Sequence, residues 1–183
     1  KAGGFAQYLC TTDELILLKP SSVSYEDAAS IPAAGVNALQ CLQKHGKLQS
    51  GQDVLINGAS GGIGTLAVQI AKSLGANVTG VCSTTNVKMV KSLGADVVID
   101  YKKEDFTRME QMYDLVFDTV AKSSFSDCKR ILKPKGRYVT TAFSPGLALK
   151  AKMVRGDKKL IPIIGNPTKD DLIVLLVDIV ASE

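Results

Sequence analysis

A glycine-rich segment between an apolar run and an amphipathic run constrains this chain more than any other feature. Residues Asn57–Gly64 read Asn-Gly-Ala-Ser-Gly-Gly-Ile-Gly and follow Asp53–Ile56, which has the composition of a buried strand. The next residues, Thr65–Leu74, place apolar side chains at helical spacing. A glycine turn that leads from a strand into a helix exposes unpaired backbone N–H groups at the helix N-terminus, and these groups bind phosphate. The segment therefore predicts a phosphate-binding turn of the dinucleotide type.

The composition is that of an ordinary globular domain. The chain has 183 residues, 45% of them hydrophobic and 22% charged, with a net charge of +4. Its densest basic cluster lacks the interleaved aromatic residues of a nucleic-acid site: Lys150, Lys152, Arg155, Lys158 and Lys159. We therefore expect no nucleic-acid partner. No apolar stretch reaches the length of a membrane span, and no secretory leader is visible.

Four cysteines and one histidine are too scattered for a metal site. Cys10, Cys41, Cys82 and Cys128 show no Cys-x-x-Cys spacing, and His45 stands alone. Four thiols that are free of disulfide bonds suit a reducing compartment. We expect a cytoplasmic protein without a bound metal, or an organellar one if a leader has been removed.

After Gly51, strand-like and helix-like runs alternate. The strands are predicted at Val54–Ile56, Asn77–Cys82, Val97–Asp100, Leu115–Asp118, Arg137–Thr141 and Leu160–Ile164. Helices are predicted at Thr65–Leu74, Thr85–Leu93, Ser124–Leu132 and Lys169–Ala181, with a weaker one near Glu104–Met112. Gly75 and Gly94 stand where helix C-caps belong, and Thr168 stands at an N-cap. This rhythm predicts a doubly wound α/β fold (Rossmann) with a six-stranded parallel sheet in the order 3-2-1-4-5-6.

The first fifty residues do not follow this alternation. Strand-like pieces at Phe5–Cys10 and Leu15–Leu18 have no obvious partners. Ser24 and Asp27 have the spacing of a capping box and open a helix, and a second helix is predicted at Ala34–Lys44. We interpret residues 1–22 as the remnant of another domain and residues 23–183 as the dinucleotide-binding domain.

The residues after the second predicted strand indicate which dinucleotide is bound. In NAD-binding folds an acidic residue about 20 positions beyond the glycine motif binds the adenosine ribose. Residues 80–88 contain no acid and instead offer Ser83, Thr84, Asn86 and Lys88. Hydroxyl, amide and ammonium groups donate hydrogen bonds, and no carboxylate would repel a 2′-phosphate. The sequence therefore favours NADPH over NADH, although the same polar residues would also cap the next helix.

Two other nucleotide-binding families are excluded by missing residues. The glycine turn is similar to that of short-chain dehydrogenases, whose proton transfer needs a Tyr-x-x-x-Lys pair. None of the five tyrosines has a lysine four positions later. A P-loop needs Gly-Lys-Ser/Thr at its end, whereas Gly64 is followed directly by Thr65.

Several segments together resemble the cofactor-binding half of the medium-chain dehydrogenase/reductase superfamily, in its zinc-free NADPH quinone and enone oxidoreductase branch. Besides the glycine turn, the matching pieces are Gly4–Tyr8, Ala28–Pro32, Ala38–Gln40, Lys91–Asp96, Val98–Tyr101 and Tyr113–Asp114. The resemblance implies a preceding catalytic barrel-like domain. It also implies hydride transfer from NADPH to a quinone or an α,β-unsaturated carbonyl compound, by the complete protein and not by this part alone.

The resemblance also implies a set of cofactor-binding residues. Ser60, Gly61, Gly62 and Ile63 would line the pyrophosphate. Ser83, Asn86 and Lys88 would surround the 2′-phosphate, with Tyr101 nearby. Thr119 and Val120 would flank the adenosine and ribose, and Ala142 and Phe143 would approach the nicotinamide. A threonine of the family that packs near the nicotinamide is replaced here by Asn37, whose role is either that contact or the capping of a helix turn.

Two departures from related enzymes bear on the chemistry. Zinc-dependent relatives have a metal-binding cysteine in the segment that reads Ala33-Ala34-Gly35-Val36-Asn37 here, and alanine cannot bind zinc. A zinc-containing alcohol dehydrogenase is therefore the weaker alternative. No residue is predicted as a catalytic acid, because Tyr101 and Tyr138 are as readily explained as surface or core tyrosines. A non-catalytic NADPH sensor or scaffold remains an alternative.

The last predicted strand points to self-association. Leu160–Ile164 is apolar and is expected at the edge of the sheet, where an uncovered strand needs a partner. In the family this edge pairs across a two-fold axis. We therefore expect a homodimer through this strand, unless the missing domain or the last helix covers it, and expect Ile163→Lys to disrupt it.

Overall fold

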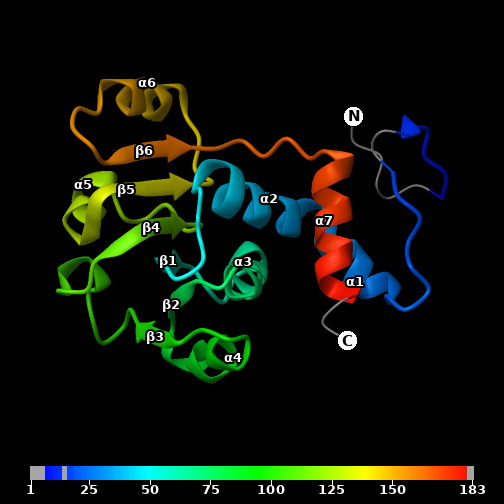
Figure 1. Cartoon of the computed structure of the whole chain (residues 1–183), viewed down its shortest axis with the longest axis horizontal. Coiled ribbons are helices and arrows are strands. Elements are labelled where there is room, and N and C mark those ends of the chain that lie inside the picture. Colours follow the sequence, from blue (N-terminus) through cyan, green and yellow to red (C-terminus); the bar gives the residue numbers. More distant parts are fainter. Residues whose placement is uncertain (1–6, 14–15, 181–183) are drawn as a thin grey trace.

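The computed structural model describes residues 7–13 and 16–180, and its centre is one parallel sheet (Figure 1). Six strands lie in the order β3-β2-β1-β4-β5-β6, and every neighbouring pair is parallel. The predicted strand order is therefore confirmed. The strands are β1 (Asp53–Asn57), β2 (Asn77–Cys82), β3 (Val97–Asp100), β4 (Tyr113–Asp118), β5 (Leu132–Thr140) and β6 (Lys159–Pro162).

Helices cover both faces of the sheet. The helices that follow the strands are α3 (Gly62–Ser73), α4 (Val87–Ser92), α5 (Phe125–Cys128), α6 (Pro145–Met153) and α7 (Lys169–Val180). Gly75 and Gly94, just beyond α3 and α4, have φ angles of 75° and 105°, so both predicted glycine C-caps are confirmed. Asp171 N donates to Thr168 Oγ1 over 3.3 Å, which confirms the predicted cap of α7.

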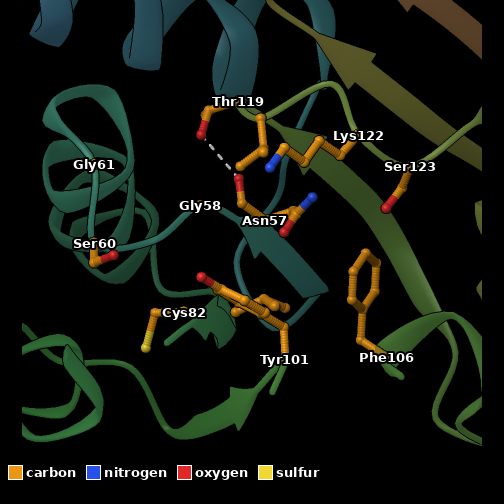
Figure 2. A pocket seen from close by; sticks show the side chains of 12 residues that line it. Asn57, Gly58, Ser60, Gly61, Cys82, Tyr101, Phe106, Thr119, Lys122 and Ser123 are labelled. Atoms are coloured by element: carbon orange, nitrogen blue, oxygen red, sulfur yellow. Dashed lines mark hydrogen bonds between the residues drawn. The ribbon is translucent and has the colours of Figure 1, made fainter. Parts of the chain in front are cut away.

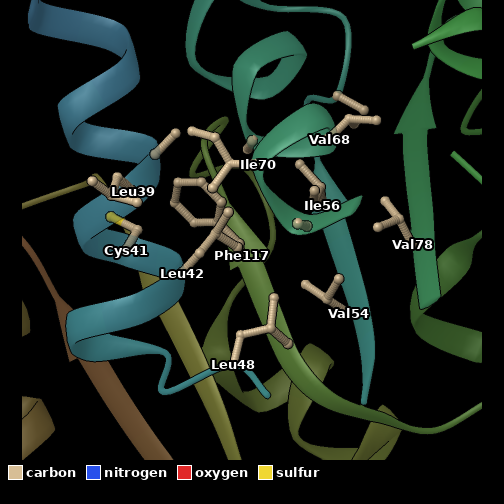
Figure 3. Packing of buried hydrophobic residues seen from close by; sticks show 14 of the residues in the cluster. Leu39, Cys41, Leu42, Leu48, Val54, Ile56, Val68, Ile70, Val78 and Phe117 are labelled. Carbon is tan, nitrogen blue, oxygen red and sulfur yellow. The ribbon is translucent and has the colours of Figure 1, made fainter. Parts of the chain in front are cut away.

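Alternate residues of β1 supply two separate cores, one on each face of the sheet. Val54 and Ile56 pack with α3 and the N-terminal helices (Figure 3), whereas Leu55 packs on the other face with Phe125 and Tyr138. Each of these β1 side chains is completely buried. A parallel strand with helices on both sides is apolar at every position, which explains the uninterrupted apolar run seen in the sequence.

One long helical stretch precedes the sheet, where two separate helices were predicted. It runs from α1 (Tyr25–Ser30) through a π-helical turn to α2 (Val36–Leu39) and ends in a second π-helical turn at His45. Ser24 is the predicted N-cap, because its Oγ accepts from Asp27 N over 3.0 Å. Pro32, which has no N–H to donate, lies inside this continuous stretch at the start of the first π-helical turn, where the α-helical hydrogen-bond pattern gives way to the π-helical one.

One expected helix and the expected N-terminal strands differ in the structure, and one helix was not predicted. The helix expected near Glu104–Met112 is only a 3-10 turn at Phe106–Arg108. The helix α6 was not predicted, because Leu147 and Ala151 pack inward while Leu149 and Met153 are exposed, so no single apolar face marks it. Residues 7–10 and 16–18 form no strand, since no neighbouring strand pairs with them; Phe5, Ala6 and Leu15 lie outside the described residues.

Within the described part of the chain, no helix combines the length and the apolar character that crossing a bilayer requires.

Candidate functional site

The turn from β1 into α3 is built by glycines at two positions where a side chain would not fit. Gly58 has a φ of 85°, and a Cβ there would lie 2.6 Å from Val120 Cγ2. A Cβ on Gly64 would lie 2.8 Å from Ala59 Cα and would also overlap the Gly58 carbonyl oxygen. These two glycines allow the helix to start close against the turn, as the third glycine of dinucleotide-binding motifs does. By contrast, a Cβ on Gly62 would meet nothing within 4 Å.

The N-terminus of α3 is open to a ligand. Its N-cap residue is Gly61, and no side chain caps it. The first helical bond from this turn is Thr65 N to Gly61 O, at 2.9 Å. The N–H groups of Gly62 and Ile63 therefore belong to the first turn, where a helix has no carbonyl partners of its own. This arrangement, with the positive end of the helix dipole, favours an anion at Gly61–Ile63.

Hydrogen bonds connect the glycine turn to the ends of both neighbouring strands. Gly58 N and Ala59 N donate to Val81 O in β2 over 3.1 and 3.0 Å. On the other side, Thr119 donates to Asn57 O through both its N–H, at 3.1 Å, and its hydroxyl, at 2.9 Å. The ends of β2, β1 and β4 are therefore held as one rigid edge.

A cavity of about 550 Å³ lies at this edge (Figure 2). It is located at the carboxyl ends of β1 to β4, where the strand order changes direction between β1 and β4. Ligands of doubly wound sheets bind at this kind of switch point. In Figure 2, Thr119 and Lys122 lie across the cavity from Tyr101 and Phe106. The lining residues are Asn57, Gly58, Ser60, Gly61, Val81, Cys82, Tyr101, Phe106, Thr119, Val120, Lys122 and Ser123.

A buried carboxylate holds the loop that forms one wall of this cavity. Asp118, the last residue of β4, is completely buried and accepts from Val120 N, Ala121 N and Asn57 Nδ2 over 2.9, 3.0 and 2.9 Å. The Tyr138 hydroxyl donates to the other oxygen of Asp118 over 2.6 Å. Burial, with Asp118 as the second cause, raises the pKa of Tyr138, so this phenol keeps its proton and is not an acid facing the cavity.

The polar residues after β2 form a compact turn beside the cavity. Asn86 Nδ2 donates to Ser83 Oγ over 3.3 Å, and Ser83 Oγ lies 3.1 Å from the Thr85 hydroxyl. Lys88 is exposed on α4. Ser83, Asn86 and Lys88 do not line the cavity; Ser83 follows Cys82, which does, and Asn86 is joined to Ser83.

The structure brings five of the predicted site residues to the cavity wall and leaves eight off it. The five are Ser60, Gly61, Tyr101, Thr119 and Val120. Gly62 and Ile63 directly follow Gly61 as the first two residues of α3. Ala142 lines a smaller cavity of about 180 Å³ with Tyr138, and Phe143 is 49% exposed. The Asn37 side chain donates to Ala33 O over 2.9 Å, four residues earlier in the same helical stretch, and lies beside Gly165.

Sequence reasoning missed several residues that the structure brings to the site. Asn57, Cys82, Phe106, Lys122 and Ser123 line the cavity, and Asp118 and Tyr138 lie behind its wall. The only local signal was position. Cys82 and Asp118 each end a predicted strand and Asn57 directly follows one, and the ends of parallel strands meet at one edge.

The described residues include no group of three or more histidine, cysteine or acidic side chains placed to hold a metal ion. Cys41, Cys82 and Cys128 are buried, and Cys10 is exposed. Burial raises the pKa of Cys41 and of Cys128 to about 12, so neither thiol is a thiolate at neutral pH.

The sequence of this chain matches a known protein family and several of its members. The model of the zinc-binding dehydrogenase family matches residues 62–168. The chloroplast envelope quinone oxidoreductase homolog of Arabidopsis thaliana is 33% identical over 93% of this chain and 55% of its own length. The 2-methylene-furan-3-one reductase of Solanum lycopersicum is 35% identical over 78% of this chain and 37% of its own length. This chain thus spans between about a third and just over half of these relatives.

A solved structure shows the same likeness. The quinone oxidoreductase from Coxiella burnetii superimposes with a TM-score of 0.78 and 30% sequence identity, over 88% of this chain and 52% of that protein.

Proposed function

This chain belongs to the zinc-binding dehydrogenase family within the medium-chain dehydrogenase/reductase superfamily, and on that premise we propose that it is the cofactor-binding part of an oxidoreductase. The complete protein would transfer hydride from NADPH to a quinone or an α,β-unsaturated carbonyl compound. The observation that carries the proposal is the cavity at the switch point of the sheet, which opens beside an uncapped helix N-terminus.

The pyrophosphate of the cofactor would bind at Ser60, Gly61, Gly62 and Ile63. Gly62 presents a backbone with open space around its Cα, so a phosphate oxygen can approach the N–H groups closely. Ser60 adds a hydroxyl at the cavity wall. The helix dipole of α3, twelve residues long, supports a negative charge at this point.

The adenosine would occupy the part of the cavity between β3 and β4. Thr119 and Val120 line one wall and Tyr101 the other, with its side chain 56% exposed and free to lie along a base. Because Asp118 fixes the loop that begins at Thr119, that wall is formed before a ligand arrives.

A 2′-phosphate would lie beside Ser83, Asn86 and Lys88, which makes NADPH the proposed cofactor. These residues carry hydroxyl, amide and ammonium groups, and residues 83–88 contain no carboxylate. A donor-rich loop without an acid favours a phosphate over a ribose hydroxyl.

The nicotinamide end would extend toward Ala142 and Phe143 after β5, and toward Asn37. NADPH supplies the hydride when it is bound, and the role of this chain is to orient the ring and to exclude water. Tyr138 is held by Asp118, and no described side chain is assigned as the proton donor, so the proton would come from solvent.

The proposal is tested by calorimetric titration with NADPH and NADH at equal salt concentration. We expect NADPH to bind more tightly, and we expect Lys88→Glu to weaken NADPH by about tenfold while NADH changes little. Lys91→Glu is the matched control, since Lys91 is also an exposed lysine of α4. Preference for NADH would overturn the choice of cofactor, and binding of neither would overturn the site.

We further propose that the protein works in the cytoplasm.

We also propose that it forms a homodimer through the outer edge of β6. Among the described residues, β6 lies at the end of the sheet and pairs with β5 alone, on its inner side. The strand ends at Pro162, earlier than predicted, and Ile163 is only 8% exposed because it packs into the protomer's own core. Ile163→Lys is therefore the wrong probe of this edge, whereas Ile164, at 66% exposed, is a suitable one.

A further inference from the structure

A carboxylate reaches the end of β2 from the neighbouring strand, although residues 80–88 contain none. Asp100, the last residue of β3, is the register partner of Cys82, the last residue of β2. Cys82 and the next residue of the chain after Asp100, Tyr101, both line the cavity. An acid at the end of β2 is the feature that selects a ribose hydroxyl in NAD sites. Here an acid lies at almost the same place but comes from β3.

Hydrogen bonds hold this carboxylate away from the cavity. The Thr84 hydroxyl donates to Asp100 Oδ2 over 2.6 Å, and Lys102 N donates to Oδ1 over 3.0 Å. Lys103 Nζ is 3.9 Å from Oδ2. The Asp100 side chain is buried, whereas Thr84 is exposed in the turn that leads into α4. Each carboxylate oxygen therefore has a hydrogen-bond partner that does not line the cavity.

The group is charged at neutral pH. The hydrogen bond from Thr84 is the largest cause that lowers the pKa of Asp100, and the two lysines add to it. A free carboxylate at this edge would accept a hydrogen bond from a ribose 2′-hydroxyl and would repel a 2′-phosphate. The choice between the two cofactors then depends on which way Asp100 is turned.

We propose that Thr84 is a specificity-determining residue, which selects a 2′-phosphorylated cofactor by engaging Asp100 and turning its charge away from the ribose. This inference rests on the proposed use of NADPH. Thr84 acts through Asp100 and is a positioning residue. The Thr84 hydroxyl also connects the turn at Ser83–Asn86 to the end of β3. The side chains proposed to bind the 2′-phosphate and the carboxylate of Asp100 are therefore joined by one hydrogen bond.

The test uses two probes of the adenosine end, 2′,5′-ADP and 5′-AMP, titrated into the wild type and into Thr84→Val. The variant keeps the shape of the side chain and removes the hydroxyl. We expect the affinity for 2′,5′-ADP to fall by about three- to tenfold while that for 5′-AMP stays equal or rises. Loss of a merely structural contact would instead weaken both ligands to the same extent.

Three further variants separate charge from folding. Thr84→Ser keeps the hydroxyl and should behave as the wild type. Adding Asp100→Asn to Thr84→Val removes the negative charge of Asp100. This double variant should regain the preference for 2′,5′-ADP, although the hydrogen bond between residues 84 and 100 is still absent. Thr107→Val is the matched control, since its hydroxyl donates to Asp105 over 2.7 Å and it lies outside this turn. Thermal unfolding monitors all of them, and Thr84→Ala replaces Thr84→Val if that variant does not fold.

The outcomes distinguish this inference from the function on which it rests. If the wild type prefers 2′,5′-ADP and Thr84→Val keeps the same ratio of affinities, Thr84 has no role in specificity and the NADPH proposal stands. An equal loss for both probes, or no recovery with Asp100→Asn, also overturns the inference. If the wild type itself shows no preference for 2′,5′-ADP, the choice of NADPH is wrong and the inference is lost with it.

Discussion

The hydroxyl of Tyr138 in β5 donates a hydrogen bond over 2.6 Å to the carboxylate of Asp118, the last residue of the adjacent strand β4, and both side chains are buried. The other oxygen of Asp118 accepts from the loop that forms a wall of the cavity. A residue behind the site therefore sets the position of residues within it. The pair is also the most direct place to measure how strongly this wall is held.

Replacing Tyr138 by phenylalanine should destabilise the protein. The ring still packs edge-on against Phe125, but the buried carboxylate loses a partner. A hydrogen bond to a charged group contributes about 1.5–3 kcal/mol, so the free energy of unfolding in urea should fall by about that amount. Tyr8→Phe, at a tyrosine that is 91% exposed, is the control. An unchanged urea midpoint would show that Asp118 is satisfied without the phenol.

Two glycines of the turn should respond differently to alanine. Gly64→Ala pushes a Cβ against Ala59 Cα at 2.8 Å and should lower the free energy of unfolding by about 1–3 kcal/mol. Gly62→Ala has open space and should leave stability nearly unchanged, yet its methyl group would stand where the pyrophosphate is proposed to approach. We expect NADPH affinity to fall by about tenfold in Gly62→Ala. Urea unfolding curves and NADPH titrations of both variants test these expectations. Unchanged NADPH affinity in Gly62→Ala would contradict the proposed binding of the pyrophosphate at this turn.

The ion pairs of Lys133 with Asp53 and Asp114 should contribute to stability in a pH-dependent way. Lys133 Nζ lies 2.7 Å from both Asp53 and Asp114, and its hydrogen bond is the largest cause that lowers the pKa of Asp53. A lowered carboxyl pKa adds stability above the unfolded value, about 3.9, and this stability is lost as the pH falls through the folded value. The same bonds raise the pKa of Lys133, so its share is lost only in strongly alkaline solution.

Lys133→Met measures this contribution. Because the lysine is 35% exposed, we expect a loss of only about 0.5–1 kcal/mol near neutral pH after solvent screening is allowed for. The difference from the wild type should shrink when urea unfolding is repeated at about pH 3. Lys91→Met, at an exposed lysine of α4, serves as the reference. If the difference in unfolding free energy between Lys133→Met and the wild type is the same at both pH values, the ion pairs are not its cause.

Ile164→Lys should convert the proposed dimer to a monomer. Ile164 follows β6 and is 66% exposed, so a charge there is tolerated within one protomer but not in an apolar contact between two. Light scattering should give half the wild-type mass. Val97→Lys, at a residue 53% exposed on the opposite edge strand β3, should leave the mass unchanged. A wild type that is already monomeric would end the proposal.

Local pattern was enough to predict most of the fold. The apolar runs that became β1 to β4 and the helical spacing of Thr65–Leu74 are properties of contiguous residues, and the glycine turn joins them. The alternation of strands and helices then leaves few topologies, because parallel crossovers are right-handed. Prediction failed where local pattern is absent. Helix α6 has apolar side chains on opposite faces, and residues 7–13 and 16–19, the described part of the chain before Pro20, have no strand beside them.

The sequence by itself determined the order of elements and the glycine turn, whereas the tertiary structure alone decided which side chains share the site. Asp118 meets Asn57 from 61 residues away, and Thr84 meets Asp100 from 16 residues away. No spacing rule predicts these pairs. They depend on which strands are neighbours and on the register in which they pair, and register places the last residues of separate strands side by side.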